Sequence, residues 1–426
     1  MKNYFVKKSS LKGELYIPSS KSQSMRAILF ASLAKGKSKI KNFLKSDDIF
    51  VFIEGCRKFK AKIEIKKNNL EIEGVNSKIV LKKNDSLDVK NSGIALRFLT
   101  AVYAIADKKI IITGDSSICR NRPMQPLIHA LNFLNADIKS LKKEGFAPIE
   151  INGPITNGKV KIEGADSQYV SALLIAASLL KEDTYIEVEN PGEKPWVDLT
   201  LNWLDKFNVK YINENFEKYK VSGGNKFKAF EYAVPSDFSS ILFPIVAALI
   251  TNSEITIKDI VFDDLQKDQK TIDVFKKFNA EIEVNKNDNS IIVKKSTLFG
   301  SAEIDINDFV DSLPILAVFA CFNDGKIILK NASVCKNKES NRIAVISSEL
   351  KKMNAKIEVL DDGLVIEKSN LKPATVNSYN DHRIAMSLCV AALAIDGITT
   401  IEDISCIDKT YPGFKEDFIK MGACIL

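Results

Sequence analysis

A short polar stretch runs directly into an apolar segment of helical length six times along the 426-residue chain. Each apolar segment is followed by a turn and by a run rich in β-branched residues, which is typical of a strand. The polar starts lie about 70 to 75 residues apart, a spacing that indicates six copies of one supersecondary unit. We expect a helix to begin at each of six residues: Ser22, Ser92, Ser167, Ser239, Asp311 and Asp381.

Serine and aspartate are among the residues that most often cap helix N-termini. A helix N-terminus carries partial positive charge and N–H groups that lack intrahelical partners. Where several such ends face one place, they form a binding site for anions. The pattern alone therefore predicts an anionic ligand.

Three segments each contain two alternating runs joined by a polar turn, and they predict β-hairpins at residues 62–74, 280–295 and 355–368. With the helix–turn–strand units, these hairpins give each repeat the order β-α-β-α-β-β. The stretch 221–237 contains Gly-Gly and Pro after the third repeat, so we expect a domain boundary there.

We therefore predict an α/β protein with two similar domains of three repeats each. The first domain is expected to span residues 17–230. The second is expected to combine residues 1–16 with residues 231–426, because the N-terminal strand precedes the first repeat and can pair with the C-terminal half.

Composition excludes several classes of protein. A hydrophobic content of 45% and a charged content of 27% are those of a globular protein. The longest apolar runs, such as 241–250, are too short to span a bilayer. The basic N-terminus has no apolar core of a signal peptide, so a cytoplasmic location is expected. The net charge of +7 comes from lysines that alternate with acids, which favours solvated faces over a nucleic-acid surface.

Cysteine and histidine give no sign of a metal site. The seven cysteines are scattered without a CxxC pair, which predicts reduced thiols. The two histidines, His129 and His382, belong to no metal-binding motif, and we interpret His129 as structural. We expect no metal and no cofactor.

Arginine is rare in this chain and its positions are informative. Only seven of the 61 basic residues are arginine. Its planar fork grips carboxylate and phosphate with two parallel hydrogen bonds, which lysine cannot do. Arg57 and Arg120 are expected to be surface or structural residues. The five others lie near predicted helix starts or in polar turns, and they indicate a ligand rich in carboxylate and phosphate: Arg26, Arg97, Arg122, Arg342 and Arg383.

Eight segments occur in the order and spacing of a known family: 19–34, 90–101, 114–127, 166–174, 309–317, 337–344, 379–386 and 409–414. They include SSKSQSMRAILFASLA, GDSSICRNRPMQPL, NKESNRIA and YNDHRIAM. With them the chain resembles the enolpyruvyl transferase family, in its 5-enolpyruvylshikimate-3-phosphate (EPSP) synthase branch. The resemblance implies an inside-out α/β barrel in each domain, a monomer, and helix N-termini that meet at an active site in the interdomain cleft.

The resemblance also implies a reaction. The 5-hydroxyl of shikimate 3-phosphate adds to C2 of phosphoenolpyruvate, and the tetrahedral intermediate then loses phosphate, without cofactor or metal. This is a step of the shikimate pathway towards chorismate and aromatic amino acids. Both substrates carry the anionic groups that the arginines predict.

Site residues follow from the same resemblance. The phosphoenolpyruvate set is Lys21, Gly93, Arg122, Arg342, Arg383 and Lys409. The shikimate 3-phosphate set is Ser22, Arg26, Ser167, Gln168, Asp311 and Lys338. The catalytic set is Lys21, Asp311, Glu339 and His382, in which Asp311 deprotonates the acceptor hydroxyl and Glu339 moves a proton at the C3 methylene. We expect His382 to form a hydrogen bond with substrate rather than to transfer a proton. Fixed cations can stabilise charge that develops at C2 without solvent reorganisation.

The chain departs from the family pattern at three positions. Asp166 and Glu193 replace serines and place carboxylates where the 3-phosphate would lie. Either these side chains turn outward, or a cation such as Lys194 pairs with them, or the acceptor is a different one. Ile94 replaces a common threonine beside Gly93, which in the family borders the site of the inhibitor glyphosate, so we expect low glyphosate sensitivity.

Three other functions remain open on the sequence alone. The first is transfer to UDP-N-acetylglucosamine, as in the sister enzyme, which has a Gly-Cys loop. Here Cys119 lacks that glycine, Ser22 replaces an asparagine, and His382 stands in the Asp-x-Arg motif. The second is a nucleic-acid enzyme related to RNA 3′-phosphate cyclases, which the scattered charge disfavours. The third is a non-catalytic anion-binding relative.

Overall fold

The six repeats fold into six four-stranded sheets of one topology within residues 2–262 and 265–426, the part of the chain that the computed structural model describes. In every sheet the first two strands are parallel, and the third and fourth add in antiparallel fashion. The chain divides into two units, Ser19–Val234 and Met1–Pro18 with Pro235–Leu426. We call them the internal unit and the terminal unit.

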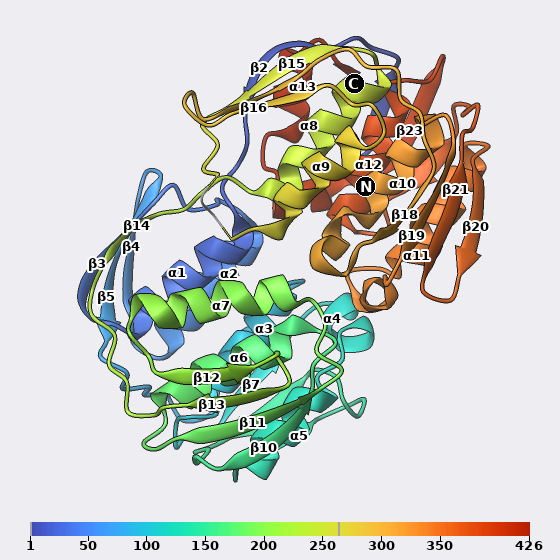
Figure 1. Cartoon of the computed structure of the whole chain (residues 1–426). Coiled ribbons are helices and arrows are strands. Elements are labelled where there is room, and N and C mark those ends of the chain that lie inside the picture. The colour runs from blue at the N-terminus through green and yellow to red at the C-terminus, as the bar shows by residue number, and fades with distance from the viewer. Residues whose placement is uncertain (1, 263–264) are drawn as a thin grey trace. The chain divides into compact units, whose positions relative to one another are not determined.

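The internal unit contains the sheets of repeats one to three (Figure 1). Their strand orders are β14 (Glu231–Ala233)–β3 (Lys35–Lys41)–β5 (Asn69–Val75)–β4 (Lys62–Lys66), β6 (Asp85–Asp88)–β7 (Ile110–Thr113)–β9 (Ile149–Asn152)–β8 (Asp137–Ser140), and β10 (Lys159–Glu163)–β11 (Thr184–Glu189)–β13 (Lys218–Val221)–β12 (Tyr211–Glu214). Its helices are α1 (Lys21–Leu33), α2 (Asp47–Lys58), α3 (Gly93–Tyr103), α4 (Ser116–Asn121), α5 (Gln125–Phe133), α6 (Ser167–Leu179) and α7 (Lys194–Lys206).

The terminal unit contains the sheets of repeats four to six. Their strand orders are β2 (Lys12–Tyr16)–β15 (Glu254–Lys258)–β17 (Ser290–Val293)–β16 (Ile282–Asn285), β18 (Ala302–Asp305)–β19 (Lys326–Lys330)–β21 (Gly363–Glu367)–β20 (Lys356–Leu360), and β22 (Thr375–Asn377)–β23 (Ile398–Glu402)–β1 (Tyr4–Lys7)–β24 (Cys424–Ile425). Its α-helices are α8 (Phe238–Ile250), α9 (Lys270–Lys276), α10 (Leu313–Phe322), α11 (Arg342–Lys352), α12 (His382–Ala392) and α13 (Phe414–Lys420). Its described residues also form four 3₁₀ helices: η1 (Lys267–Gln269), η2 (Asn307–Ser312), η3 (Ser333–Asn337) and η4 (Ile404–Lys409).

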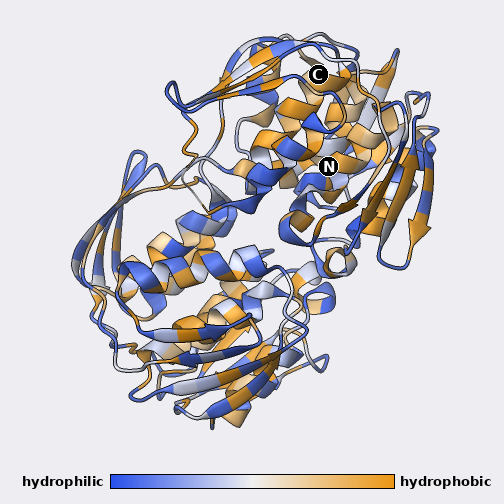
Figure 2. Cartoon of the chain, viewed as in Figure 1, coloured by the Kyte–Doolittle hydropathy of each residue, from blue (hydrophilic) through white to orange (hydrophobic). Residues whose placement is uncertain are grey.

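Each unit buries three helices and places its sheets around them. Helices α1, α3 and α6 are buried along almost their whole length, and so are α8, α10 and α12. A helix that is apolar on all sides is stable only when it is enclosed, and Figure 2 shows the hydrophobic residues of α8, α10 and α12 inside the terminal unit. Strands alternate buried and exposed residues, as in β11, because only one sheet face meets the helices.

The predicted hairpins are confirmed as β4–β5, β16–β17 and β20–β21. The N-terminal strand is two strands that pair as expected with the C-terminal half, β1 with β23 and β2 with β15. The units divide after residues 18 and 234, where the sequence analysis expected divisions after 16 and 230. The difference at 230 arises because β14 pairs with β3 of the first repeat.

The predicted helix starts are right at three of six positions. Ser92 and Asp381 are the N-caps of α3 and α12. Ser167 is the first residue of α6, which Asp166 caps. The predicted starts at Ser22 and Ser239 are each one residue late, because α1 begins at Lys21 after the cap Ser20 and α8 begins at Phe238 after the cap Asp237. Neither of these two serines is the N-cap. Asp311 is not a cap either, since it lies in η2 and its carboxylate binds arginines. Among the described residues, no helix is long and apolar enough to cross a membrane.

Candidate active site

Arg342, the first residue of α11, binds three carboxylates at once. Its Nη1 donates to Asp311 Oδ1 at 2.7 Å, and its Nη2 donates to Glu339 Oε2 at 2.8 Å. Its Nε donates to Asp381 Oδ2 at 2.8 Å. The guanidinium is 1% exposed, so these charge-assisted hydrogen bonds are shielded from water. The carboxylates hold the pKa of Arg342 well above its ordinary value, although burial alone would lower it.

Two more cations complete what we call the Arg342 cluster. Arg383, in the first turn of α12, donates through Nη2 to Ser239 Oγ at 2.8 Å and to Asp311 Oδ2 at 2.9 Å. Its Nε and Nη1 are buried and have no hydrogen-bond partner within the described residues. Lys409, at the end of η4, donates to Glu339 Oε1 at 2.9 Å. Three carboxylates and three cations thus meet where η2, α11, α12 and η4 begin or end.

Asp311 is an ionised carboxylate in this arrangement. Partial burial raises its pKa, but Arg383, Arg342 and Lys338 lower it more strongly, and the pKa stands well below the usual range. A carboxylate held in this way is a weak base. It becomes a stronger base only when another anion takes up part of the charge of those arginines.

Asp268 in η1 has the opposite environment. Its side chain is 1% exposed, and its Oδ1 has no hydrogen-bond partner in the described part of the chain. Burial raises the pKa of Asp268 to about 8, with further upward contributions from Asp311 and Asp237 and a downward one from Arg383. Asp268 is therefore protonated at neutral pH, and sequence reasoning did not identify it.

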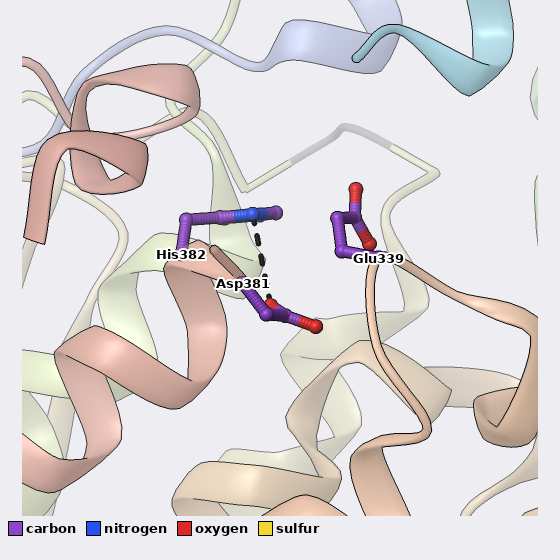
Figure 3. A group of neighbouring side chains, drawn as sticks. All are labelled: Glu339, Asp381 and His382. Carbon is purple, nitrogen blue, oxygen red and sulfur yellow. Dashed lines mark ion pairs between the residues drawn. The ribbon is translucent and has the colours of Figure 1, made fainter. Parts of the chain in front are cut away.

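Glu339, Asp381 and His382 gather closely enough to suggest a metal site. One atom from each lies within 4.8 Å of the others, and Figure 3 shows His382 and Glu339 extending toward one another beside Asp381. His382 Nδ1 is 3.8 Å from Asp381 Oδ1. Yet Arg342 already binds both carboxylates and Lys409 binds Glu339. The positive charge of this group therefore comes from side chains, and a divalent ion would have to displace them.

In the internal unit, the predicted residues near α1 make contacts within the chain. Lys21 is the first residue of α1, and its Nζ lies 3.4 Å from Asp48 Oδ2. Lys21 is therefore paired with a carboxylate of the chain itself in this structure. Arg26 donates to Thr200 Oγ1 at 3.0 Å, to Trp196 O at 3.0 Å and to Ser22 O at 3.3 Å. Arg26 can still attract an anion by its charge, but these donors are engaged.

Gly93, Arg97, Arg122 and Gln168 lie together beside the start of α3. A Cβ added at Gly93 would meet Arg97 Nη1 at 2.7 Å, Arg122 Nη1 at 3.5 Å and Gln168 Oε1 at 3.6 Å. Arg97 is fully buried and donates to Pro123 O at 3.1 Å and to Gln168 Oε1 at 3.4 Å. A Cβ atom at position 93 would therefore have to push the Arg97 guanidinium away from these hydrogen bonds, so glycine fits best there.

The start of α6 is occupied by carboxylates of the chain itself. Glu193 Oε2 accepts from both Ser167 N and Ser167 Oγ at 3.0 Å. Asp166 Oδ1 accepts from Gln168 N at 3.0 Å, and its Oδ2 lies 3.5 Å from Arg97 Nη2. Neither side chain turns outward. Asp166 pairs with Arg97, whereas Lys194 lies over the ring of Phe216.

The structure thus brings the predicted residues into groups within each unit. The terminal unit gathers Asp311, Lys338, Glu339, Arg342, His382, Arg383 and Lys409. The internal unit gathers Gly93 with Arg122 and Gln168, joins Ser22 with Arg26, and joins Ser167 with Glu193. His129 is an exposed residue of α5 and lies beside Gln125. The placement of a site between the two domains stays a prediction.

Comparison with known proteins extends these observations to the whole chain. The family model of EPSP synthase (3-phosphoshikimate 1-carboxyvinyltransferase) matches residues 6–418. A 3-phosphoshikimate 1-carboxyvinyltransferase of Acetivibrio thermocellus is 38% identical over 420 residues, which cover 99% of this chain and 98% of that protein. One of Chlamydia caviae is 40% identical over 416 residues, which cover 97% and 92%.

Solved structures agree. The EPSP synthase of Acinetobacter baumannii superposes with a TM-score of 0.83 at 25% identity, and covers 100% of this chain and 99% of that one. The predicted α/β fold class is confirmed. By sequence along almost its whole length and by fold, this chain belongs to the EPSP synthase family.

Proposed function

We propose that this chain transfers the enolpyruvyl group of phosphoenolpyruvate to the 5-hydroxyl of shikimate 3-phosphate and releases phosphate. The family match over residues 6–418 carries the proposal. Relatives of similar length named 3-phosphoshikimate 1-carboxyvinyltransferase support it. The enzyme would act in the shikimate pathway as a cytoplasmic monomer, without metal or cofactor.

Phosphoenolpyruvate offers one carboxylate and one phosphate, and the Arg342 cluster supplies complementary groups. Arg383 has two buried N–H groups without a partner in the described residues, and a buried donor of this kind favours an incoming acceptor. The proposed phosphoenolpyruvate set is Arg342, Arg383 and Lys409 from the terminal unit and Lys21, Gly93 and Arg122 from the internal unit. The proposed acceptor set is Ser22, Arg26, Ser167 and Gln168 from the internal unit and Asp311 and Lys338 from the terminal unit.

Two of the three carboxylates of the Arg342 cluster, Asp311 and Glu339, divide the proton transfers. In the addition step, the acceptor oxygen bonds to C2, Asp311 takes the hydroxyl proton, and a proton is added at C3. In the elimination step, C3 loses a proton and the C2–O bond to phosphate breaks, which restores the double bond. We assign the C3 proton to Glu339, because Lys409 and Arg342 hold this carboxylate and can respond to a change of its charge.

Substrate binding would also change the basicity of Asp311. Its pKa is low because Arg383 and Arg342 face it. The anionic groups of phosphoenolpyruvate would draw on the same guanidiniums, so the pKa of Asp311 should rise when the substrate binds. In this way the base becomes effective only in the presence of its co-substrate.

A phosphate-release assay tests the proposal. Purified chain with phosphoenolpyruvate and shikimate 3-phosphate should release phosphate, and the product should keep the 3-phosphate and gain two vinyl protons. Replacing the acceptor by UDP-N-acetylglucosamine should abolish release. Phosphate release with UDP-N-acetylglucosamine but not with shikimate 3-phosphate would assign the chain to the sister reaction. If neither acceptor led to phosphate release, the chain would be a non-catalytic relative.

A further inference from the structure

The first N–H group of α6 is bound by an anion that the chain supplies itself. Glu193 Oε2 accepts from Ser167 N and Ser167 Oγ, each at 3.0 Å. The Glu193 side chain is 1% exposed. A helix N-terminus with a neighbouring hydroxyl is also a typical place for a phosphate group, and a carboxylate that accepts both bonds uses the same two donors.

The position of Glu193 is not explained by its own helix. Glu193 is the N-cap residue of α7, yet its side chain caps nothing in α7. Its backbone is left-handed, with φ 45° and ψ 39°, a conformation that is unfavourable for a residue with a Cβ atom. The chain therefore holds a strained residue whose carboxylate serves the neighbouring helix α6.

The surroundings contain a second carboxylate. Asp166 Oδ1 accepts from Gln168 N at 3.0 Å, so the first two N–H groups of α6 are both bound by acids. Arg97 Nη2 lies 3.5 Å from Asp166 Oδ2. A phosphorylated ligand that uses the donors of Ser167 must displace Glu193, because two anions cannot share these hydrogen bonds.

We propose that Glu193 is a specificity-determining residue that competes with the phosphate of the acceptor for Ser167. The proposal rests on the proposed function, which supplies a phosphorylated acceptor. The acceptor can use Ser167 only in molecules in which the Glu193 carboxylate has left it. The apparent affinity for the acceptor is therefore reduced by the fraction of molecules in which Glu193 is released from Ser167. An acceptor gains from the site only if its phosphate binds Ser167 more strongly than Glu193 does, so the residue discriminates against acceptors that carry a weaker anion.

The test compares Glu193→Ser with Glu189→Ser. Glu189 is an exposed residue at the end of β11 that pairs with Lys161, so its variant controls for the change of net charge. Glu193→Ser should lower the KM for shikimate 3-phosphate about tenfold, the size of a helix-terminal contact, and leave the KM for phosphoenolpyruvate unchanged. Glu189→Ser should change neither constant.

A binding measurement makes the test independent of turnover. Calorimetric titration should show that Glu193→Ser increases the affinity for shikimate 3-phosphate more than the affinity for shikimate, which lacks the phosphate. Glu193→Gln keeps hydrogen-bond acceptors but no charge, and it should give an intermediate increase.

A merely structural role predicts a different result. Glu193→Gln would then behave as the wild type, and Glu193→Ser would bind shikimate 3-phosphate no better than the wild type does. Either result would overturn the proposal. Failure of the proposed function would give a different result, because neither the wild type nor any variant would then release phosphate. The calorimetric titrations would still decide the role of Glu193.

Discussion

Arg342 in the terminal unit and Arg97 in the internal unit are both almost completely buried, at 1% and 0% exposure, but their partners differ. Arg342 binds three carboxylates between 2.7 and 2.8 Å. Arg97 donates to a backbone carbonyl and a side-chain amide, lies 3.5 Å from one carboxylate, and stacks on the ring of Tyr169.

The difference separates two ways of using a buried arginine. Arg97 fixes the shape of its surroundings mainly through hydrogen bonds to neutral groups, which do not titrate. Arg342 belongs to a balanced group of charges that an anionic substrate or a proton can rearrange. Chemistry is therefore expected at the Arg342 cluster, and selection of the acceptor is expected near Arg97 and the start of α6.

The largest expected effect is on the free energy of unfolding when Arg342 or Arg97 is replaced. Arg342→Met leaves Asp311, Glu339 and Asp381 without their shared cation and should reduce the free energy of unfolding by about 3–5 kcal/mol. Arg97→Met removes mainly hydrogen bonds to neutral groups and should cost about 1–3 kcal/mol. Urea unfolding of both variants measures the difference. Equal losses would show that the carboxylates of the Arg342 cluster are not a distinct feature.

The rate of phosphate release should also show that Arg342 belongs to the reacting site. Arg342→Met should reduce the rate of phosphate release roughly 10³-fold, as expected for loss of a fixed cation at developing charge. Arg57→Met is a suitable control, since Arg57 is a partly exposed residue that pairs with Glu54. A normal rate for Arg342→Met would remove this residue from the proposed site.

The pH dependence of stability provides a smaller effect in the terminal unit. Burial, with Asp311 and Asp237, raises the pKa of Asp268 from 3.8 to about 8, against the effect of Arg383. The folded chain thus keeps a proton that the unfolded chain loses. The stabilising contribution is full below pH 3.8 and is lost as the pH rises to about 8, with a slope of at most about 1.4 kcal/mol per pH unit.

Asp268→Asn should abolish this slope. Urea unfolding at pH 5 and at pH 8 should therefore show a smaller loss of stability for the variant than for the wild type. Asp308→Asn, which alters a partly exposed carboxylate paired with Lys270, should keep the wild-type slope. Parallel curves for wild type and Asp268→Asn would show that Asp268 is not protonated in the folded chain.

The smallest expected effect is at Ile94 in the internal unit. Ile94 follows Gly93, where an added Cβ would already meet Arg97 Nη1 at 2.7 Å. If the bulk of Ile94 displaces the backbone at Gly93, Ile94→Thr should lower the inhibition constant of glyphosate several-fold. Ile105→Thr, at another partly buried position packed on the same core, should leave the constant unchanged. An unchanged constant for Ile94→Thr would remove the basis of the expected insensitivity.

Much of the fold could be predicted because it depends on local patterns. The hairpins and the six-fold repeat are visible as alternation and spacing in the sequence. The prediction missed the first residue of a helix where several cap-forming residues follow one another, as in Ser19–Ser20–Lys21–Ser22, since tertiary structure decides which of them caps. Asp311 was misjudged because its carboxylate binds Arg342 and Arg383, residues that follow it by 31 and 72 positions.

The site could be predicted in its residues but not in its contacts. Motif resemblance pointed to Arg342, Glu339 and Arg383, which the structure brings together. It could not indicate that Asp381, expected only as a helix cap, also binds Arg342. Asp268 lies in a polar segment without a pattern, so no signal marked it. The partner of Glu193 depends on how α6 and α7 begin, which the sequence does not specify.

One kinetic comparison tests most directly whether Arg383 binds phosphoenolpyruvate and Gln168 binds the acceptor. Steady-state phosphate release should be measured for the wild type, for Arg383→Lys in the terminal unit and for Gln168→Ala in the internal unit, with each substrate varied in turn. We predict that Arg383→Lys raises the KM for phosphoenolpyruvate about tenfold or more and changes that for shikimate 3-phosphate little, and that Gln168→Ala does the reverse. Equal effects of both variants on both substrates would contradict the account.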